Sequence, residues 1–263
     1  MTKKYGILAY PAKHSLSPVM HNAAFKALDL DAQYGVYEIV PEDLRDFMEN
    51  VRHEPISGLS VSLPHKEMVR LYLDVIDEAA EEIGAVNTVA NNGGRLYGHN
   101  TDWMGAMKAL GSVEGKRVVV LGAGGSARAV IYGCLRGGAE SVVVANRTVE
   151  RAEQLAGELG CEAAGLAEMV EGDILVHTTA AWTLGSAELP VFCSEEYVRG
   201  FEVVMDIAYK PLMTPLLEMA DKAGIKVVTG EKMLLYQAVE QFKLWTDEEA
   251  PVEVMREVLN RNI

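Results

Sequence analysis

One stretch, Arg117 to Ala129, limits the folds open to this chain more than any other. It begins with the apolar run 118–121, which is typical of a strand buried on both faces of a parallel sheet. The run ends at the glycine-rich segment 122–127, GAGGSA, and apolar residues at helical spacing follow it. A strand, a G-x-G-x-x-A turn and a helix in this order predict a dinucleotide-binding unit.

The residue types in this turn each suit a bound dinucleotide. Gly122 allows the tight turn, Gly124 lacks a Cβ and lets the backbone approach a pyrophosphate, and Ala127 keeps the helix close to the sheet. The first amides of the helix have no partner within it and favour negative charge. The residues predicted to bind the cofactor here are Gly122, Ala123, Gly124, Gly125, Ser126 and Ala127. A glycine-rich turn without a ligand is the alternative for this motif taken alone.

The end of the next predicted strand, 141–145, bears on which cofactor binds. NAD-binding proteins carry an acidic residue about 20 residues after the glycines, where it holds the ribose hydroxyls. Here the strand is followed by Asn146, Arg147 and Thr148. An arginine can pair with a 2′-phosphate through two hydrogen bonds, whereas an acid would repel it. These residues favour NADP over NAD, and a solvated arginine at a helix start is the simpler alternative.

Length, charge and cysteine usage narrow the class of protein. The 263 residues suffice for two modest domains, and the net charge of −14 argues against nucleic acid or an acidic membrane surface as a partner. Cys134, Cys161 and Cys193 are widely spaced and indicate a reducing compartment without a disulfide frame or a zinc site. We expect a cytoplasmic protein that binds small molecules and no metal, with no signal peptide or membrane span.

Two serines follow the first predicted strand, 5–10. In the segment 14–18, HSLSP, Ser17 is a favourable N-cap for a helix that Pro18 begins. Ser15 is not needed for that cap. Two hydroxyls beside an open helix N-terminus would form a small carboxylate site, and helix capping alone is the alternative for Ser17.

Lys66 lies just past the end of a third predicted strand, 56–63. Ligands of α/β folds bind at the carboxyl ends of the strands, so this lysine stands where a ligand is expected. A solvated surface lysine is the commoner fate of any single lysine.

The remaining segments alternate predicted strands with predicted helices. Strands are expected at 32–40, 173–179, 202–207 and 225–228, with a hairpin over 85–97. Helices are expected from 41, over 74–82, 103–110 and 149–159, from 214, and over 230–245 and 252–260. This alternation predicts an α/β protein with a mostly parallel sheet in its second half.

Eight short motifs in one order resemble the shikimate dehydrogenase family along nearly the whole chain. They are HSLSP (14–18), VSLPHK (61–66), AVNT (85–88), GHNTD (98–102), GAGGSAR (122–128), NRT (146–148), DIAYKP (206–211) and the segment 230–237. The resemblance implies an N-terminal α/β substrate-binding domain (1–101), a Rossmann-like NADP-binding domain (102–236), and C-terminal helices (237–263) that return to the first domain. It also implies an active-site cleft between the two domains.

The resemblance implies reversible hydride transfer between NADPH and the ring carbonyl of 3-dehydroshikimate, giving shikimate, a step of chorismate and aromatic amino-acid biosynthesis. Negative charge develops on the carbonyl oxygen and needs a proton or a positive donor. Lys66 would fill that role and Asp102 would orient it. Further implied contacts are Ser15, Ser17, Ser62, Asn87, Tyr209 and Gln237 with the substrate, and Gly230 with the cofactor.

Two departures from the family pattern affect the site. Ser62 stands where the family usually has threonine, which keeps the hydroxyl. The family tends to show Asn-x-Thr, then Ser or Pro, then Gly-Met after the fourth strand of the cofactor domain. This chain has His177 to Thr183, HTTAAWT. The packing of that loop near the cofactor is therefore expected to differ.

Two other functions are compatible with these motifs. A quinate or dual quinate/shikimate dehydrogenase is the nearest, and the lack of an acid at 146–148 argues mildly against its NAD-using members. A non-catalytic ligand-sensing module on the same fold is the other, and the presence of both Lys66 and Asp102 argues against it. Monomer and homodimer are equally compatible with the sequence.

Overall fold

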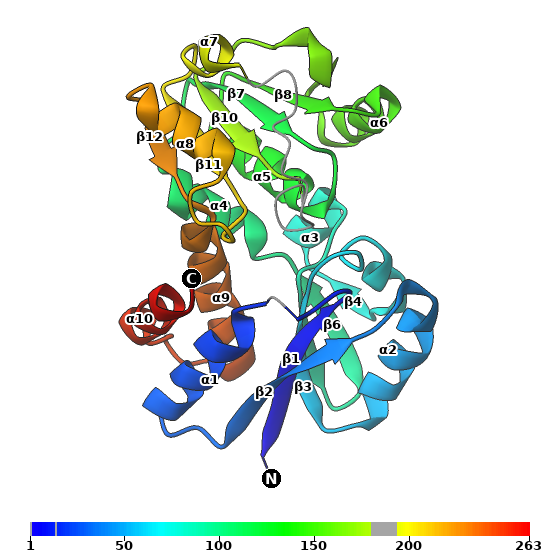
Figure 1. Cartoon of the computed structure of the whole chain (residues 1–263). Helices are drawn as coiled ribbons and strands as arrows, with labels where there is room; N and C mark the ends of the chain where they lie inside the picture. The colour runs from blue at the N-terminus through cyan, green and yellow to red at the C-terminus, as the bar shows by residue number, and fades with distance from the viewer. Residues whose placement is uncertain (1, 14, 180–193) are drawn as a thin grey trace. The chain divides into compact units, whose positions relative to one another are not determined.

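The computed structural model describes residues 2–13, 15–179 and 194–263. His14, Cys193 and the part of the atypical loop from Ala180 to Thr183 lie outside the described residues. By its internal contacts the chain divides into two compact units. We call residues 1–101 with 237–262 unit 1, and residues 102–236 with Ile263 unit 2. Each unit contains a sheet of its own (Figure 1).

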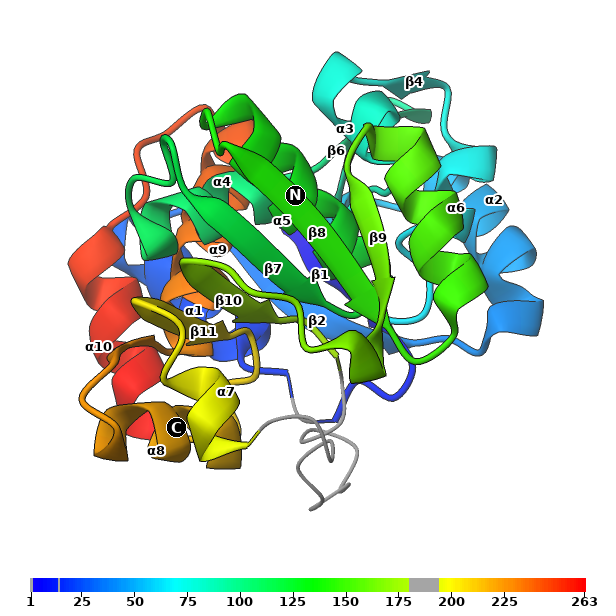
Figure 2. The ribbon, with the colours of Figure 1, turned by 90° about the horizontal axis from the view of Figure 1, so that it is seen from above.

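Unit 2 contains, among the described residues, a six-stranded sheet in the order β12-β11-β10-β7-β8-β9, with every pair parallel. Figure 2 shows β7 and β8 of this sheet side by side, with β9 beside β8. In this doubly wound order the two halves diverge from the central pair β7 and β10. The strands are β7 (Arg117–Leu121), β8 (Ser141–Asn146), β9 (Glu162–Gly165), β10 (Ile174–His177), β11 (Val203–Asp206) and β12 (Lys226–Val228). The helices are α4 (Asp102–Leu110), α5 (Gly125–Arg136), α6 (Val149–Leu159), α7 (Glu195–Val198) and α8 (Pro215–Lys222), with the 3-10 turn η3 (Leu166–Glu168).

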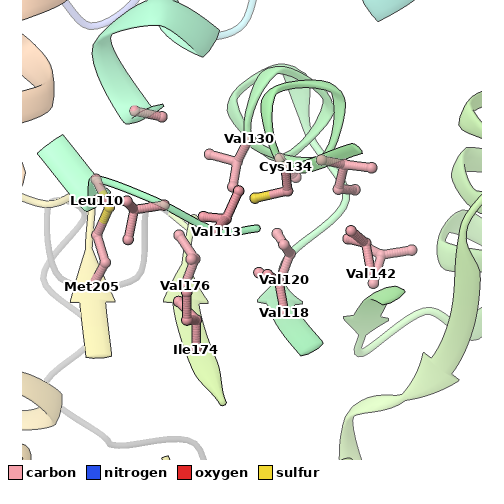
Figure 3. Packing of buried hydrophobic residues seen from close by; sticks show 14 of the residues in the cluster. Leu110, Val113, Val118, Val120, Val130, Cys134, Val142, Ile174, Val176 and Met205 are labelled. Carbon is pink, nitrogen blue, oxygen red and sulfur yellow. The ribbon is translucent and has the colours of Figure 1, made fainter. Parts of the chain in front are cut away.

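Strand β7 is buried on both faces, as its apolar run predicts. Val118 and Val120 pack on one face in a cluster with Val130 and Cys134 of α5 (Figure 3). The alternate residues of β7, Val119 and Leu121, join a second cluster with side chains of α7 and α8. Strand periodicity of two thus sends successive side chains into two different cores.

Unit 1 contains, in the described part of the chain, a six-stranded mixed sheet in the order β2-β1-β3-β5-β6-β4. Figure 1 shows β1 between β2 and β3, and these three strands are parallel. β5 runs antiparallel to β3 and to β6, so the predicted hairpin is confirmed. The strands are β1 (Lys3–Ala9), β2 (Ala32–Glu38), β3 (Ile56–Val61), β4 (Val75–Ile76), β5 (Thr88–Asn92) and β6 (Arg95–His99).

The secondary structure differs from the sequence prediction at several places: β4, β9 and α7 were not predicted, and one predicted helix is shorter than expected. The helices of unit 1 are α1 (Ser17–Ala27), α2 (Leu44–His53), α3 (Glu78–Ile83) and α10 (Val252–Asn262), with the 3-10 turns η1 (Pro41–Asp43) and η2 (Met68–Tyr72). The predicted helix over 74–82 begins only at Glu78, because Asp77 caps it by accepting from the Ala80 amide at 2.7 Å. In unit 2, strand β9 has two exposed residues and no apolar run, so the sequence did not predict it.

Helix α9 (Gly230–Thr246) carries the chain from unit 2 into unit 1. Near its end the indole of Trp245 donates to the Val89 carbonyl at 3.0 Å and packs against the rings of Tyr5 and His21. A Cβ on Gly58 of β3 would lie 2.5 Å from the indole nitrogen, so only glycine leaves room for this ring. These contacts anchor the C-terminal half of α9 on the sheet of unit 1.

His21 in α1 makes the stability of unit 1 sensitive to acid. Its ring is fully buried and stacks on Tyr34 with 4.6 Å between centroids. Burial lowers the pKa of His21 from 6.5 to about 3, and a contact with the Gln241 side chain opposes this only in part. The unfolded chain therefore binds a proton that the folded chain does not bind. The contribution to stability is complete above pH 6.5 and is lost as the pH falls toward 3.

Between pH 7 and pH 4.5 we expect the free energy of unfolding of the parent chain to fall by about 2–3 kcal/mol more than that of His21→Phe. Urea unfolding at the two pH values measures this difference. The matched control is His53→Phe at an exposed position of α2, which should show the parent's acid sensitivity. Equal acid sensitivity of His21→Phe and the parent would contradict the assignment.

Candidate active site

The carboxyl ends of the central strands of unit 2 are aligned by their register. Leu121 of β7 pairs with Ala145 of β8 and with His177 of β10, and His177 pairs with Asp206 of β11. The segments that follow these strands consequently leave the sheet at one edge, beside the point where the strand order reverses.

The glycine turn at this edge has the geometry that its sequence predicts. Gly122 has φ of +110°, and a Cβ there would lie 2.7 Å from Oγ1 of Thr178. Gly124 is exposed and extended, and a Cβ on it would meet no atom within 4 Å. Helix α5 begins at the next residue, Gly125, so its first amides border this open space. Ala127 packs in the core, which fits its predicted role of keeping helix and sheet close.

The residues after β8 are accessible to a ligand at the same edge. Arg147 and Thr148 are exposed, and Asn146 braces the turn by donating its side-chain amide to the Thr148 carbonyl at 2.9 Å. Arg151, also exposed, lies in the first turn of α6 and was not among the predicted residues. Its signal is a second arginine one helical turn after the first, which offers another guanidinium to a phosphate.

Gly230, predicted as a cofactor contact, is buried at the start of α9. A Cβ on it would lie 2.2 Å from the carbonyl oxygen of Ile207 and 2.4 Å from that of Ala208. Only glycine permits this approach of two backbones. The residue that follows Ala208 is Tyr209, which is half-buried. The smallness of Gly230 thus shapes the segment that carries Tyr209.

Two of the predicted substrate residues, Asn87 and Gln237, lie side by side in unit 1. The Asn87 side-chain amide donates to Oγ1 of Thr101 at 2.9 Å and to Oε1 of Gln237 at 3.4 Å. Its oxygen accepts from the Thr101 amide at 2.8 Å and from the Thr88 hydroxyl at 2.7 Å. All four residues are buried. Their side chains are therefore held in place before any ligand binds.

A buried chain of hydrogen bonds extends this network through residues that the sequence did not predict for the site. Gln241 of α9 donates to the Thr88 hydroxyl at 3.0 Å and accepts from the Ser60 hydroxyl at 2.8 Å. Ser60 in turn accepts from Tyr34 at 2.6 Å, and Tyr34 also contacts the Ser17 side chain. The chain links Ser17 to Asn87, although one residue is on α1 and the other precedes β5. Gln241 lies one helical turn after Gln237, and this spacing alone does not distinguish a buried amide from a solvated one.

The structure corrects the predicted role of Ser17 as an N-cap. Helix α1 begins at Ser17 itself, the cap position is Leu16, and no side-chain cap bond forms there. Instead Oγ of Ser15 accepts from the Ser17 amide at 3.3 Å, so Ser15 partly serves the role expected of its neighbour. The prediction failed because Pro18 is compatible with the second helical position as well as the first.

Lys66 is half-buried in a segment whose backbone is fixed on several sides. Its carbonyl accepts from the Val86 amide at 2.8 Å, next to Asn87. His65 is buried, and its ring bonds to the Ile39 carbonyl at 2.8 Å. Ser62, which begins this segment, donates its amide to the Leu8 carbonyl at 2.9 Å and so lies where β1 and β3 end together.

Asp102 is buried and begins α4, directly after Thr101 of the Asn87 network. The Lys66 carbonyl accepts from the amide of Val86, which precedes Asn87. The amide of Thr101, which precedes Asp102, donates to the Asn87 side chain. Each predicted catalytic residue thus has a backbone bond beside it that involves Asn87 or its neighbour in the chain.

The described residues contain neither a candidate metal site nor a candidate membrane span. No group of three or more histidine, cysteine, aspartate or glutamate side chains in this part of the chain is arranged to hold a metal ion. Within the same residues no helix is long and apolar enough to cross a membrane.

An open doubly wound sheet with a glycine turn at its reversal point, joined to a second α/β unit with a preformed polar network, is the arrangement of a dinucleotide-dependent oxidoreductase. Comparison with known protein families is more specific. Residues 7–89 match the shikimate dehydrogenase substrate binding domain, residues 105–209 match shikimate / quinate 5-dehydrogenase, and residues 230–259 match the shikimate 5'-dehydrogenase C-terminal domain.

Individual relatives agree with these matches over nearly the whole chain. Shikimate dehydrogenase (NADP+) of Thermococcus kodakarensis is 45% identical, covering 93% of this chain and 91% of the relative. The enzyme of the same name from Methanopyrus kandleri is 42% identical, covering 98% and 95%. The crystal structure of shikimate 5-dehydrogenase from Thermus thermophilus with NADP(H) and shikimate is 36% identical, with a TM-score of 0.90 over 99% of this chain and 100% of that one.

The chain belongs to the shikimate dehydrogenase family. The fold class expected from the sequence is confirmed.

Proposed function

We propose that this chain catalyses the reversible, NADP-dependent oxidation of shikimate to 3-dehydroshikimate. The observation that supports the proposal best is the buried Asn87 network, because Thr101, directly before Asp102, donates its amide to Asn87, and the Lys66 carbonyl accepts from Val86, directly before Asn87. A lysine and a carboxylate set beside fixed hydrogen-bonding groups suit a reaction in which a hydroxyl becomes a carbonyl, because the proton and the developing charge both need placed partners.

The polar groups of unit 1 would hold the substrate by its hydroxyls and its carboxylate. Asn87 and Gln237 present paired amides, and Ser62 adds a hydroxyl at the ends of β1 and β3. Ser15 and Ser17 stand at the start of α1, where the helix favours an anion. An analogue without one ring hydroxyl should bind poorly, because it leaves a buried group unpaired. Tyr209 of unit 2 is proposed as a further substrate contact.

Lys66 is the proposed proton donor to the carbonyl oxygen in the reducing direction and the acceptor in the oxidising direction. Asp102 is the proposed partner that orients Lys66 and holds a substrate hydroxyl. Backbone bonds of Lys66 and of Thr101, which precedes Asp102, would lower the cost of ordering these residues during the reaction.

NADP, when bound, supplies the nicotinamide ring that exchanges a hydride with the substrate carbon. The carboxyl edge of unit 2 fits this cofactor, since Gly124 borders open space at the start of α5. Ala123, Gly125 and Ser126 complete the proposed pyrophosphate turn, with Asn146, Arg147 and Thr148 at the 2′-phosphate. Gly230 shapes the neighbouring segment.

A test of the reaction follows the hydride itself. We expect NADPH deuterated at the transferable position to give shikimate that carries one deuterium at the former carbonyl carbon, detected by mass spectrometry. Unlabelled shikimate, or the absence of product, would overturn the proposed reaction.

Arg147→Gln should reduce the preference for NADP over NAD. Loss of a charged hydrogen bond to the 2′-phosphate costs about 1.5–3 kcal/mol, so KM for NADP should rise about ten- to a hundredfold while KM for NAD stays within about twofold. Initial rates with each cofactor measure this difference. Arg199→Gln, at an exposed residue paired with Glu195, is the control. A parallel rise in both KM values would show that Arg147 does not contact the 2′-phosphate.

We also propose that the enzyme acts in the cytoplasm and binds no nucleic acid. The net charge of −14 and the absence of a C-x-x-C pair in the sequence support this.

A further inference from the structure

A buried histidine and aspartate lie at the carboxyl edge of unit 2, outside the residues assigned above. His177 ends β10 and Asp206 ends β11, and both side chains are almost fully buried. Nδ1 of His177 lies 3.1 Å from Oδ2 of Asp206, and Nε2 lies 2.7 Å from the Thr179 hydroxyl. The three side chains form a line from the interior of the sheet to the loop that follows β10.

Hydrogen-bond chemistry makes Asp206 the acceptor at the inner end of this line. Asp206 accepts from the Ala208 amide at 3.0 Å and from the Thr214 hydroxyl at 2.9 Å, which suits an ionised carboxylate. An ionised carboxylate has no hydrogen to give, so Nδ1 of His177 must be the donor. Nε2 of His177 shares the second hydrogen bond with the Thr179 hydroxyl, at the end of the line that borders the loop after β10.

The end of the line borders the glycine turn of the cofactor edge. Thr178 donates its hydroxyl to the Leu121 carbonyl at 2.8 Å, directly before Gly122. A Cβ on Gly122 would lie 3.0 Å from Cγ2 of Thr179, so the two segments are in close contact. Displacement of Thr179 would therefore disturb the turn that is proposed to receive the pyrophosphate.

We propose that His177 and Asp206 are positioning residues of the cofactor site, which hold Thr179 against the Gly122 turn and thereby set the affinity for NADP. This inference rests on the proposed function for the identity of the cofactor. Asp206 also fixes the segment after β11 through the Ala208 amide and the Thr214 hydroxyl, and the bond from His177 extends this support to the cofactor edge.

The experiment measures NADP binding by titration calorimetry, and KM for shikimate at saturating NADP, in variants that stay folded. We expect His177→Ala and Thr179→Val each to weaken NADP binding about tenfold and to leave KM for shikimate within about twofold. The double variant should bind NADP no more weakly than either single variant, because both changes break one chain of contacts. Circular dichroism and thermal unfolding confirm that each variant is folded.

His99→Asn is the matched control, because it breaks a second histidine–aspartate pair, that of His99 with Asp77 at 2.6 Å in unit 1. It should leave NADP affinity unchanged. Folded variants at His177 and Thr179 that bind NADP as tightly as the parent would overturn the inference, as would additive losses in the double variant. A parent chain that binds NADP but does not oxidise shikimate would overturn the proposed reaction and leave this inference standing.

Discussion

Lys66→Ala is expected to lower kcat for shikimate oxidation by about 10²–10⁴-fold, the usual loss when a placed general acid or base is removed. Binding of shikimate should persist, because Asn87 and Gln237 are held by bonds that do not involve the Lys66 side chain. Steady-state kinetics give kcat, and equilibrium titration with shikimate gives the affinity separately.

Lys222→Ala serves as the control for loss of a positive charge, since Lys222 is largely exposed on α8. It should retain full turnover. A Lys66→Ala enzyme with kcat within a few-fold of the parent would remove Lys66 from the mechanism, whereas joint loss of turnover and shikimate binding would assign it to substrate binding alone.

Gly230→Ala is expected to destabilise unit 2 by about 3 kcal/mol or more and to abolish measurable NADP binding. The added Cβ would lie within 2.4 Å of two backbone carbonyl oxygens, and backbone cannot rotate away as a flexible side chain can. Chemical unfolding and NADP titration test the two effects.

Gly157→Ala is the matched control, and it is expected to stabilise the protein where Gly230→Ala destabilises it. Gly157 lies inside α6, and a Cβ there would meet no atom within 4 Å. The change should raise the free energy of unfolding by about 0.5–1 kcal/mol, because alanine loses less backbone freedom than glycine in a helix. Equal stability of the Gly157 and Gly230 variants would contradict the close backbone approach seen at Gly230.

The cofactor edge was predictable because its signals are local in sequence. The apolar run 118–121 and the glycines after it fix a buried strand, a turn and a helix start within about ten residues. The structure places all three as expected. The absence of an acid after β8, which favours NADP, is an equally local signal. The family was predicted from the eight short motifs taken together.

The supporting contacts of the site were not predictable, because their partners are distant in sequence. Gln241 meets Thr88 across 153 positions, and His177 meets Asp206 across 29. Only the folded sheet and the docking of α9 bring these groups together. Polar residues within an otherwise amphipathic helix, such as Gln241, give no sequence signal that separates a buried network from a solvated surface.

The most direct test of the proposed reaction compares initial rates of oxidation of shikimate and of quinate, each with NADP and with NAD, followed at the nicotinamide absorbance. We predict a strong preference for shikimate with NADP, by at least about tenfold in kcat/KM over each other combination. Equal or better activity with quinate or with NAD would contradict the assigned specificity. Binding of shikimate without oxidation under any combination would contradict the enzymatic function itself.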